Sequence, residues 1–291
     1  MMTLELKLQI ASCIGEQHHT VSFNEVGGGS INDCYRINIR NDRYCFCKVN
    51  SATKFPHLFS KEKKGLEFIT SKRVIKTPVI IDCFTAMDKQ VLIMEWIESA
   101  GKNESFWKLF GEQLAAMHHV HHDQFGWIED NYMGSVPQQN TWKHSWCEFF
   151  IEHRLQPLVT QCSNAHLLSS ENRLSFEKLY SKLPVIFNEE KPSLVHGDLW
   201  SGNYMCDEKQ FPVLVDPAVY FGHRSIDLGM TTLFGGFDKV FYESYNYHYP
   251  FPPNYREQWS VANLYPLLIH LILFGRSYLH QIEQILNEFN S

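Results

Sequence analysis

The first hundred residues alternate between apolar and polar positions in short runs that end at turn-forming residues. Alternation with a period of two is typical of half-buried β-strands. One helical pattern interrupts these runs, with Phe59, Glu62, Leu66 and Ile69 on one face. The pattern therefore predicts a β-rich segment that carries one helix. The predicted strands cover residues 21–26, 31–39, 44–49, 79–84 and 90–97.

The pattern changes after residue 97, where a polar stretch that contains Gly101 reads as a short linker. Helical periodicity dominates beyond it and predicts an α+β fold with two lobes. The small β-rich N-terminal lobe covers residues 1–97, and the larger, mainly helical C-terminal lobe covers residues 98–291. Helices are predicted over residues 105–119, 145–158, 171–183 and, in pieces, 254–289, with β-like runs over 193–196 and 211–216.

The composition agrees with a folded enzyme-sized chain. Of the 291 residues, 44% are hydrophobic and 20% are charged, which excludes a disordered chain. The net charge of −6 argues against binding to nucleic acid or to an anionic membrane, because both need a basic surface. The sequence contains no apolar run long enough for a transmembrane helix and no signal-peptide pattern at its N-terminus. We therefore expect a cytoplasmic protein, and a monomer is favoured.

The segment LVHGDLWSGN, residues 194–203, carries the clearest chemical signal. Asp198 is followed five residues later by Asn203 in a loop after an apolar strand, which is the spacing of a kinase catalytic loop. In such a loop the Asp orients the attacking hydroxyl group and the Asn reaches a metal ion on the nucleotide phosphates. Asp216 ends the next apolar run and adds a carboxylate suited to Mg²⁺. Together these residues predict phosphoryl transfer.

Three upstream features support a nucleotide site. Lys48 lies on a strand among apolar residues, where a cation needs a partner, and Glu62 on the following helix is the expected one. Gly27, Gly28, Gly29 and Ser30 lie between the first two strands, and glycines there would let the backbone approach phosphates. The segment Glu95, Trp96 and Ile97 is placed where a kinase hinge offers its backbone to adenine.

These residues together resemble the fructosamine kinase family, also called ketosamine-3-kinases, of the protein-kinase-like superfamily. Residues 194–203 match the family's catalytic loop, and Asp216-Pro217-Ala218 matches its D-P-A motif. Arg224 and Asp227 match its R-x-x-D-L motif. The resemblance implies a catalytic base at Asp198, metal ligands at Asn203 and Asp216, and ATP and Mg²⁺ as cosubstrate and cofactor. Residues 27–30, Lys48, Glu62 and residues 95–97 would bind the nucleotide.

The implied reaction is phosphorylation of the C3 hydroxyl of a ketosamine, either a small molecule or a protein-linked sugar, which leads to deglycation. Two alternatives stay open, a small-molecule kinase of the aminoglycoside or choline type and a nucleotide-binding pseudokinase. One departure from the family is Ser30, where some relatives carry a redox-active Cys; Cys34 lies four residues later. Trp142, Trp146 and Arg154 are either walls of the acceptor pocket or core residues.

The remaining clusters have simpler interpretations. Cys45 and Cys47 share a strand face and form at best a weak metal pair, because no second pair follows them. The run of histidines between His118 and His122 points in several directions around a helix end, and His118 is expected to pack inward. Asp227 and His196 are expected to brace the catalytic loop through hydrogen bonds rather than to transfer protons.

Overall fold

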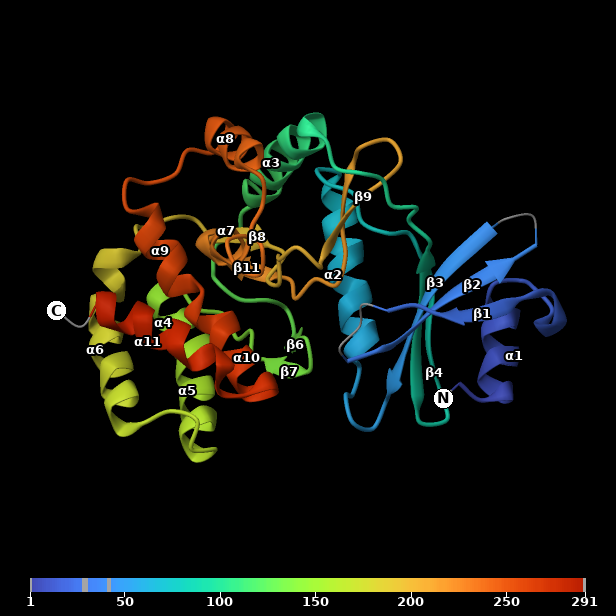
Figure 1. The fold of residues 1–291 in the computed structure, drawn as a ribbon, viewed down its shortest axis with the longest axis horizontal. Helices are drawn as coiled ribbons and strands as arrows, with labels where there is room; N and C mark the ends of the chain where they lie inside the picture. Colours follow the sequence, from blue (N-terminus) through green and yellow to red (C-terminus); the bar gives the residue numbers. More distant parts are fainter. Residues whose placement is uncertain (1, 28–30, 41–42, 290–291) are drawn as a thin grey trace. The chain divides into compact units, whose positions relative to one another are not determined.

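The computed structural model describes residues 2–27, 31–40 and 43–289 (Figure 1). The chain divides into two compact units, and the first is formed from two separate stretches of sequence. Residues 1–106 and 204–216 make the first unit, and residues 107–203 and 217–291 make the second. These units are defined by packing alone. The division into functional lobes, residues 1–97 and 98–291, therefore stays a prediction.

A five-stranded antiparallel sheet forms the centre of the first unit (Figure 1). The strand order is β1-β2-β3-β5-β4, so β3 lies at the middle of the sheet. All five strands occur where the alternating pattern predicts them. Their bounds are β1 Ser22–Glu25, β2 Asp33–Ile39, β3 Arg43–Ser51, β4 Ile80–Ala86 and β5 Lys89–Glu95.

Helices cover both faces of this sheet. Helix α1, Leu4–Cys13, packs Leu6 and Ile10 against the face that carries Cys45 and Cys47. Helix α2, Leu58–Lys72, lies along the sheet and contacts β4 and β5. Because side chains alternate along a strand, Lys48 points to the face opposite to its neighbour Cys47. The sheet therefore turns Lys48 toward α2 and away from α1.

A hairpin from the C-terminal half completes the first unit. Strands β9, Tyr204–Cys206, and β10, Pro212–Leu214, pair with each other, and the Leu214 N–H donates to the carbonyl oxygen of Lys76. Lys76 also pairs with Asp207 over 2.6 Å. Asp216, two residues after β10, belongs to this unit.

The second unit is mainly helical. Two short strands matter most for function, β8, Ser193–Val195, and β11, Tyr220–Gly222, which pair antiparallel. Helix α4 continues through a π-helical turn, η2, into α5. The other bounds are α3 Glu104–His118, β6 Asn131–Met133, β7 Val136–Gln138, α4 Trp146–Phe150, η2 Ile151–Leu155, α5 Gln156–Asn164, α6 Ser170–Ile186, α7 Ser225–Met230, α8 Lys239–His248, α9 Tyr255–Ala262, α10 Leu264–Phe274, η3 Arg276–Tyr278 and α11 Leu279–Glu288, with η1 His18–Thr20 in the first unit.

Among the described residues, no helix has both the length and the apolar character needed to cross a membrane. The most apolar helix, α10, extends only from Leu264 to Phe274.

Candidate active site

Lys48 occupies the centre of a buried charged cluster in the first unit. Its side chain is 2% exposed, and Nζ lies 2.6 Å from Oε1 of Glu62. Nζ also donates to Oδ1 of Asp216. The sequence predicts the pairing of Lys48 with Glu62, and the structure confirms it. The contact with Asp216 was not predicted, because it depends on how a hairpin distant in sequence packs.

Two acidic side chains surround one ammonium group in this cluster. Burial lowers the pKa of Lys48, but the carboxylates of Asp216 and Glu62 outweigh it and raise that pKa above its ordinary value. Burial also raises the pKa of Glu62, against the opposing effect of Lys48. Lys48 therefore stays charged, with carboxyl oxygens of Glu62 and Asp216 around it.

Asp216 is the most accessible member of this cluster, with a side chain 41% exposed. Its φ of 55° lies in the left-handed region, which is uncommon for a residue with a side chain. A carboxylate oxygen that solvent can reach is a ligand type that Mg²⁺ accepts. The chemistry of Asp216 thus fits its predicted role as a metal ligand.

The loop that contains Asp198 follows β8 directly in the second unit. Nδ2 of Asn203 donates to the carbonyl oxygen of Asp198 over 2.8 Å and to its Oδ2 over 2.9 Å. These bonds orient the carboxylate of Asp198 and leave the amide oxygen of Asn203 for another partner. An amide oxygen is also an acceptable Mg²⁺ ligand. The spacing of five residues therefore brings the two side chains together.

Gly197 allows the chain to turn sharply just before Asp198. Its φ is 82°, and a Cβ atom there would lie 2.2 Å from the carbonyl oxygen of Ala218. The Ala218 N–H donates to the carbonyl oxygen of His196 over 2.8 Å. The loop is therefore packed directly against the segment that follows the D-P-A aspartate, and only glycine fits at this position.

A fully buried carboxylate supports this turn from within. Oδ2 of Asp227 accepts the His196 N–H over 2.7 Å, and Oδ1 accepts the Gly197 N–H over 2.9 Å. His118 Nε2 lies 3.0 Å from Oδ2 of Asp227, and its Nδ1 lies 2.7 Å from the Tyr245 hydroxyl. The predicted bracing role of Asp227 is confirmed, as is the inward packing of His118.

His196 also braces the loop. Its side chain is buried, and Nδ1 accepts the N–H of Asp198 over 3.3 Å. Burial lowers the pKa of His118, although its bond with Asp227 opposes this shift. A mostly neutral imidazole beside Asp227 is consistent with a supporting role for these histidines.

The other predicted nucleotide contacts are only partly described. Gly27 is exposed at a bend after β1, whereas Gly28, Gly29 and Ser30 lie outside the described residues. Glu95 ends β5, and its N–H donates to the carbonyl oxygen of Val79 over 2.9 Å. Trp96 donates from Nε1 to Glu98 over 2.9 Å. Glu95, Trp96 and Ile97 are each partly exposed, so their hinge role stays a prediction.

The sequence matches the family described as "Fructosamine kinase" over residues 2–291. The chain belongs to the fructosamine kinase family. The match spans both compact units and includes every predicted site residue. The predictions of a kinase-type phosphotransferase and of family membership are therefore confirmed.

Individual relatives agree with this assignment. The chain is 38% identical over 269 residues to a Lactiplantibacillus plantarum protein named "Probable ketoamine kinase", covering 91% of this chain and 92% of the relative. It is 31% identical over 283 residues to an Oryza sativa protein named "Protein-ribulosamine 3-kinase, chloroplastic", covering 94% of this chain and 80% of the relative.

A crystal structure from Haemophilus somnus, which carries a provisional fructosamine-3-kinase name, superposes with a TM-score of 0.87. The two chains are 24% identical, and the match covers 98% of this chain and 96% of the other. This similarity establishes the fold, and the predicted α+β kinase-like fold class is confirmed.

The residues that could line an acceptor pocket differ in burial. Arg154 is fully buried, which favours its interpretation as a core residue. Trp146 is 5% exposed and lines a pocket together with Phe125 and Phe187, and the partly exposed Trp142 stacks on His122. In residues 2–27, 31–40 and 43–289, no group of three or more His, Cys, Asp or Glu residues could hold a metal ion. The histidine run and the Cys45–Cys47 pair therefore form no such group in the described chain.

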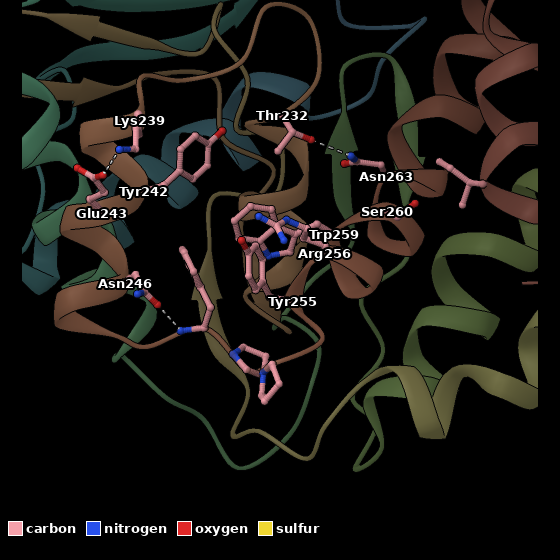
Figure 2. A pocket seen from close by; sticks show the side chains of 14 residues that line it. Thr232, Lys239, Tyr242, Glu243, Asn246, Tyr255, Arg256, Trp259, Ser260 and Asn263 are labelled. Atoms are coloured by element: carbon pink, nitrogen blue, oxygen red, sulfur yellow. Dashed lines mark hydrogen bonds and ion pairs between the residues drawn. The ribbon is translucent and has the colours of Figure 1, made fainter. Parts of the chain in front are cut away.

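Figure 2 shows a pocket in the second unit that is lined mainly by residues of α8, α9 and the loop that joins them. Its volume is about 900 Å³. The rings of Tyr242, Tyr255 and Trp259 line it, together with the Lys239–Glu243 ion pair. The described residues that line this pocket include none of the predicted site residues. The pocket is therefore distinct from the catalytic loop.

Proposed function

We propose that this protein transfers the γ-phosphoryl group of ATP to the 3-hydroxyl group of a ketosamine, a sugar joined to an amine by glycation. The phosphorylated product would be unstable and would release the sugar, so the activity would serve deglycation. A relative is named as a protein-ribulosamine 3-kinase, which makes a ribulosamine a suitable first acceptor to test. Fructosamines and erythrulosamines are the other candidates, either as small molecules or linked to protein.

The observation that carries this proposal is the orientation of Asp198. Its carboxylate is held by the Nδ2 group of Asn203, in a loop whose backbone is anchored by Asp227. A carboxylate held in this way can accept a proton from the attacking hydroxyl group. As the new bond forms between the sugar oxygen and the γ-phosphorus, the bond to the bridging oxygen breaks and ADP leaves.

The charged cluster of the first unit would bind the phosphates. Lys48 is a buried ammonium group kept charged by two carboxylates, and it would donate to phosphate oxygens. Residues 27–30 and residues 95–97 would contact the phosphates and the adenine. In this proposal residues 1–97 form the nucleotide-binding lobe, and residues 98–291 form the catalytic and substrate lobe.

The residues present also fit a magnesium ion. Asn203 and Asp216 supply one amide oxygen and one carboxylate, the hard oxygen ligands that Mg²⁺ prefers. Mg²⁺, when bound, would neutralise negative charge on the phosphate oxygens.

A panel of acceptors tests the function directly. ATP consumption would be measured with Mg²⁺ and ribulosyl-lysine, erythrulosyl-lysine, fructosyl-lysine, an aminoglycoside or choline. We expect turnover with the ketosamines alone. Turnover only with the aminoglycoside or choline would overturn the proposed acceptor, and no turnover with any acceptor despite ATP binding would favour a pseudokinase.

A matched pair of variants tests the role of Asp198. We expect Asp198→Asn to remove turnover while ATP affinity is preserved, because the amide cannot accept the proton. Asp123→Asn changes an exposed carboxylate in the same unit and should behave like the unmodified protein. Turnover by Asp198→Asn at the unmodified rate would exclude it as the catalytic base.

A further inference from the structure

A group of buried polar side chains contacts the segment that follows Asp216. Arg154, Asn140, Asn131 and Gln138 are each at most 7% exposed, and Arg154 and Asn140 have no exposed surface. Burying polar groups costs free energy unless hydrogen bonds replace those made to water. These four side chains make such hydrogen bonds, both with one another and with the backbone.

The longer series of side-chain hydrogen bonds begins at Arg154 and ends at the backbone of Val219. Nη2 of Arg154 donates to Oδ1 of Asn140 over 2.8 Å, and Nη1 donates to the carbonyl oxygen of Gln139 over 2.5 Å. Nδ2 of Asn140 donates to Oδ1 of Asn131 over 2.8 Å. Nδ2 of Asn131 then donates to the carbonyl oxygen of Val219 over 2.9 Å.

A second branch joins the same network at Asn131. The Tyr265 hydroxyl donates to Oε1 of Gln138 over 2.9 Å. Nε2 of Gln138 donates to Oδ1 of Asn131 over 2.7 Å and to the carbonyl oxygen of Ala218 over 3.2 Å. Two consecutive backbone carbonyls, those of Ala218 and Val219, are therefore held by side-chain amides.

The direction of these bonds is fixed at both ends. A guanidinium group can only donate, and a backbone carbonyl can only accept. A 180° rotation of a side-chain amide exchanges its oxygen and its NH₂ group with little change in shape. Neighbouring donors and acceptors therefore decide which of the two faces each partner. Arg154 makes Asn140 present its oxygen to the guanidinium and its NH₂ group to Asn131. Asn140 and Gln138 both donate to Oδ1 of Asn131, and this makes Asn131 present its NH₂ group to Val219. Arg154 donates to the carbonyl oxygens of Gln139 and His153 and to the amide oxygen of Asn140, so its guanidinium serves here as a hydrogen-bond donor.

The segment held by this network has an unusual conformation just before it. Asp216 has a φ of 55°, which costs free energy for a residue with a side chain. The Ala218 N–H donates to the carbonyl oxygen of His196, so Ala218 also contacts the loop that carries Asp198. We propose that Arg154 is a positioning residue, which through Asn140 and Asn131 fixes the backbone after Asp216 and so maintains the metal ligand in its binding conformation.

This inference rests on the proposed function, in which Asp216 binds the metal, and predicts an effect on metal-dependent nucleotide binding. Residues that orient metal ligands through hydrogen bonds change metal affinity about 10- to 100-fold when mutated. Binding of the ATP analogue AMP-PNP would be titrated at several Mg²⁺ concentrations, without any acceptor. Turnover with the preferred ketosamine would be measured in parallel.

Asn140→Asp is the most specific variant. Its carboxylate still accepts from Arg154 and gains an ion pair, so the fold should be retained. It can no longer donate to Oδ1 of Asn131 or to the carbonyl oxygen of Glu129, so Gln138 alone holds the oxygen of Asn131 and the bond from Asn131 to the Val219 carbonyl is less firmly fixed. We expect about a 10-fold rise in the Mg²⁺ concentration needed for half-maximal AMP-PNP binding, and a fall in kcat with a nearly unchanged ketosamine KM.

Two substitutions of Arg154 separate the effect of its hydrogen-bond donors from the effect of its side-chain volume. Arg154→Met keeps most of the volume but loses the donors, and we expect it to raise the Mg²⁺ concentration needed for half-maximal AMP-PNP binding as Asn140→Asp does. Arg154→Lys keeps a donor-only cation and should show a smaller rise. Gln258→Ala is the control, because Gln258 is a buried amide that donates to the Ile186 carbonyl in the same unit. It should lower the melting temperature without changing the Mg²⁺ dependence.

Asn140→Asp with unmodified Mg²⁺ dependence and kcat would overturn the inference, as would an equal change in Gln258→Ala. A failure of the proposed function is distinguishable, because the unmodified protein would then bind AMP-PNP without responding to Mg²⁺ or would turn over no ketosamine.

Discussion

Lys48 is held by the side chains of two acidic residues, whereas the backbone at His196 and Gly197 is held by the single carboxylate of Asp227. In the first unit the supported group is itself a charge, and the supporting charges have the opposite sign. In the second unit the supported groups are neutral N–H donors on consecutive residues. The first arrangement sets the charge state of a side chain, and the second sets the path of the backbone.

This difference indicates which changes of partner each of the two regions can tolerate. A charge cluster can exchange one partner for a bound cation or a phosphate, because its contacts are between flexible side chains. A backbone turn fixed by a buried carboxylate has no such freedom, since an unpaired buried N–H is costly. We therefore expect substitutions that disturb the turn to have larger effects than substitutions in the cluster.

The largest effect is expected for Asp227→Asn. The new NH₂ group cannot accept the N–H of either His196 or Gly197, so at least one buried donor loses its partner. We expect unfolding free energy to fall by about 3 kcal/mol and turnover to fall by at least about 100-fold. Urea denaturation and initial rates with the preferred acceptor measure the two effects.

Asp238→Asn is the matched control for that variant. Asp238 also accepts a backbone N–H, that of Val240 at the start of α8, and Asn is an equally good N-cap there. It should keep both stability and turnover. If Asp227→Asn behaves like this control, the turn does not depend on the buried carboxylate.

Lys48→Met should have the next largest effect. The variant removes the cation that would bind phosphates and leaves Glu62 and Asp216 without it. Losing one preorganised donor typically lowers kcat about 100- to 1,000-fold, and we expect a loss near the lower end. Because Asp216 is partly exposed, the loss of stability should be smaller than in Asp227→Asn. A larger loss of stability here than in Asp227→Asn would reverse the comparison.

Glu62→Gln sharpens the comparison within the cluster. Lys48 keeps Asp216 as a partner and the amide oxygen of Gln as an acceptor, so the ammonium group should remain charged and in place. We expect turnover to fall about 10-fold, in proportion to one weakened charge contact of about 1.4 kcal/mol. Turnover as low as that of Lys48→Met would mean that Glu62 does more than support Lys48.

The last effect concerns stability alone. Burial lowers the pKa of His223 to about 4, against the opposing influence of Glu190. The unfolded chain therefore takes up a proton on this residue at a higher pH than the folded chain does. Stability should fall as the pH drops from about 6.5 to about 4, and His223→Gln should reduce this dependence. Urea midpoints at pH 7 and pH 5 measure it, and equal slopes in both proteins would exclude His223 as a source.

The sequence predicts the first unit well, because every strand of its sheet alternates and is bounded by turn residues. The same alternation explains why the sequence does not predict helix α1. Leu4, Leu6, Leu8 and Ile10 alternate with polar residues, yet the helix buries Leu6 and Ile10 and leaves Leu4 and Leu8 exposed. A short segment can satisfy both periods, and packing against the sheet decides between them. Helix α8, Lys239–His248, was also not predicted.

The candidate site shows a similar limit. The pairs Lys48–Glu62 and Asp198–Asn203 could be predicted, because each is short in sequence and follows from strand, helix or loop geometry. The contact of Lys48 with Asp216 and the network around Arg154 could not. The contact of Lys48 with Asp216 and the bond from Asn131 to Val219 join segments distant in sequence, and the residue types of the network occur at many surface positions. The roles of these residues in catalysis remain predictions.

The discontinuous first unit has a consequence for how the protein is made on the ribosome. Residues 1–106 emerge first, but β9, β10 and Asp216 are synthesised only after about a hundred further residues. Until then Lys48 lacks Asp216 and Lys76 lacks Asp207. The first unit therefore stays incomplete until the later hairpin is made, and the proposed nucleotide site is completed late in translation although most of it is encoded early.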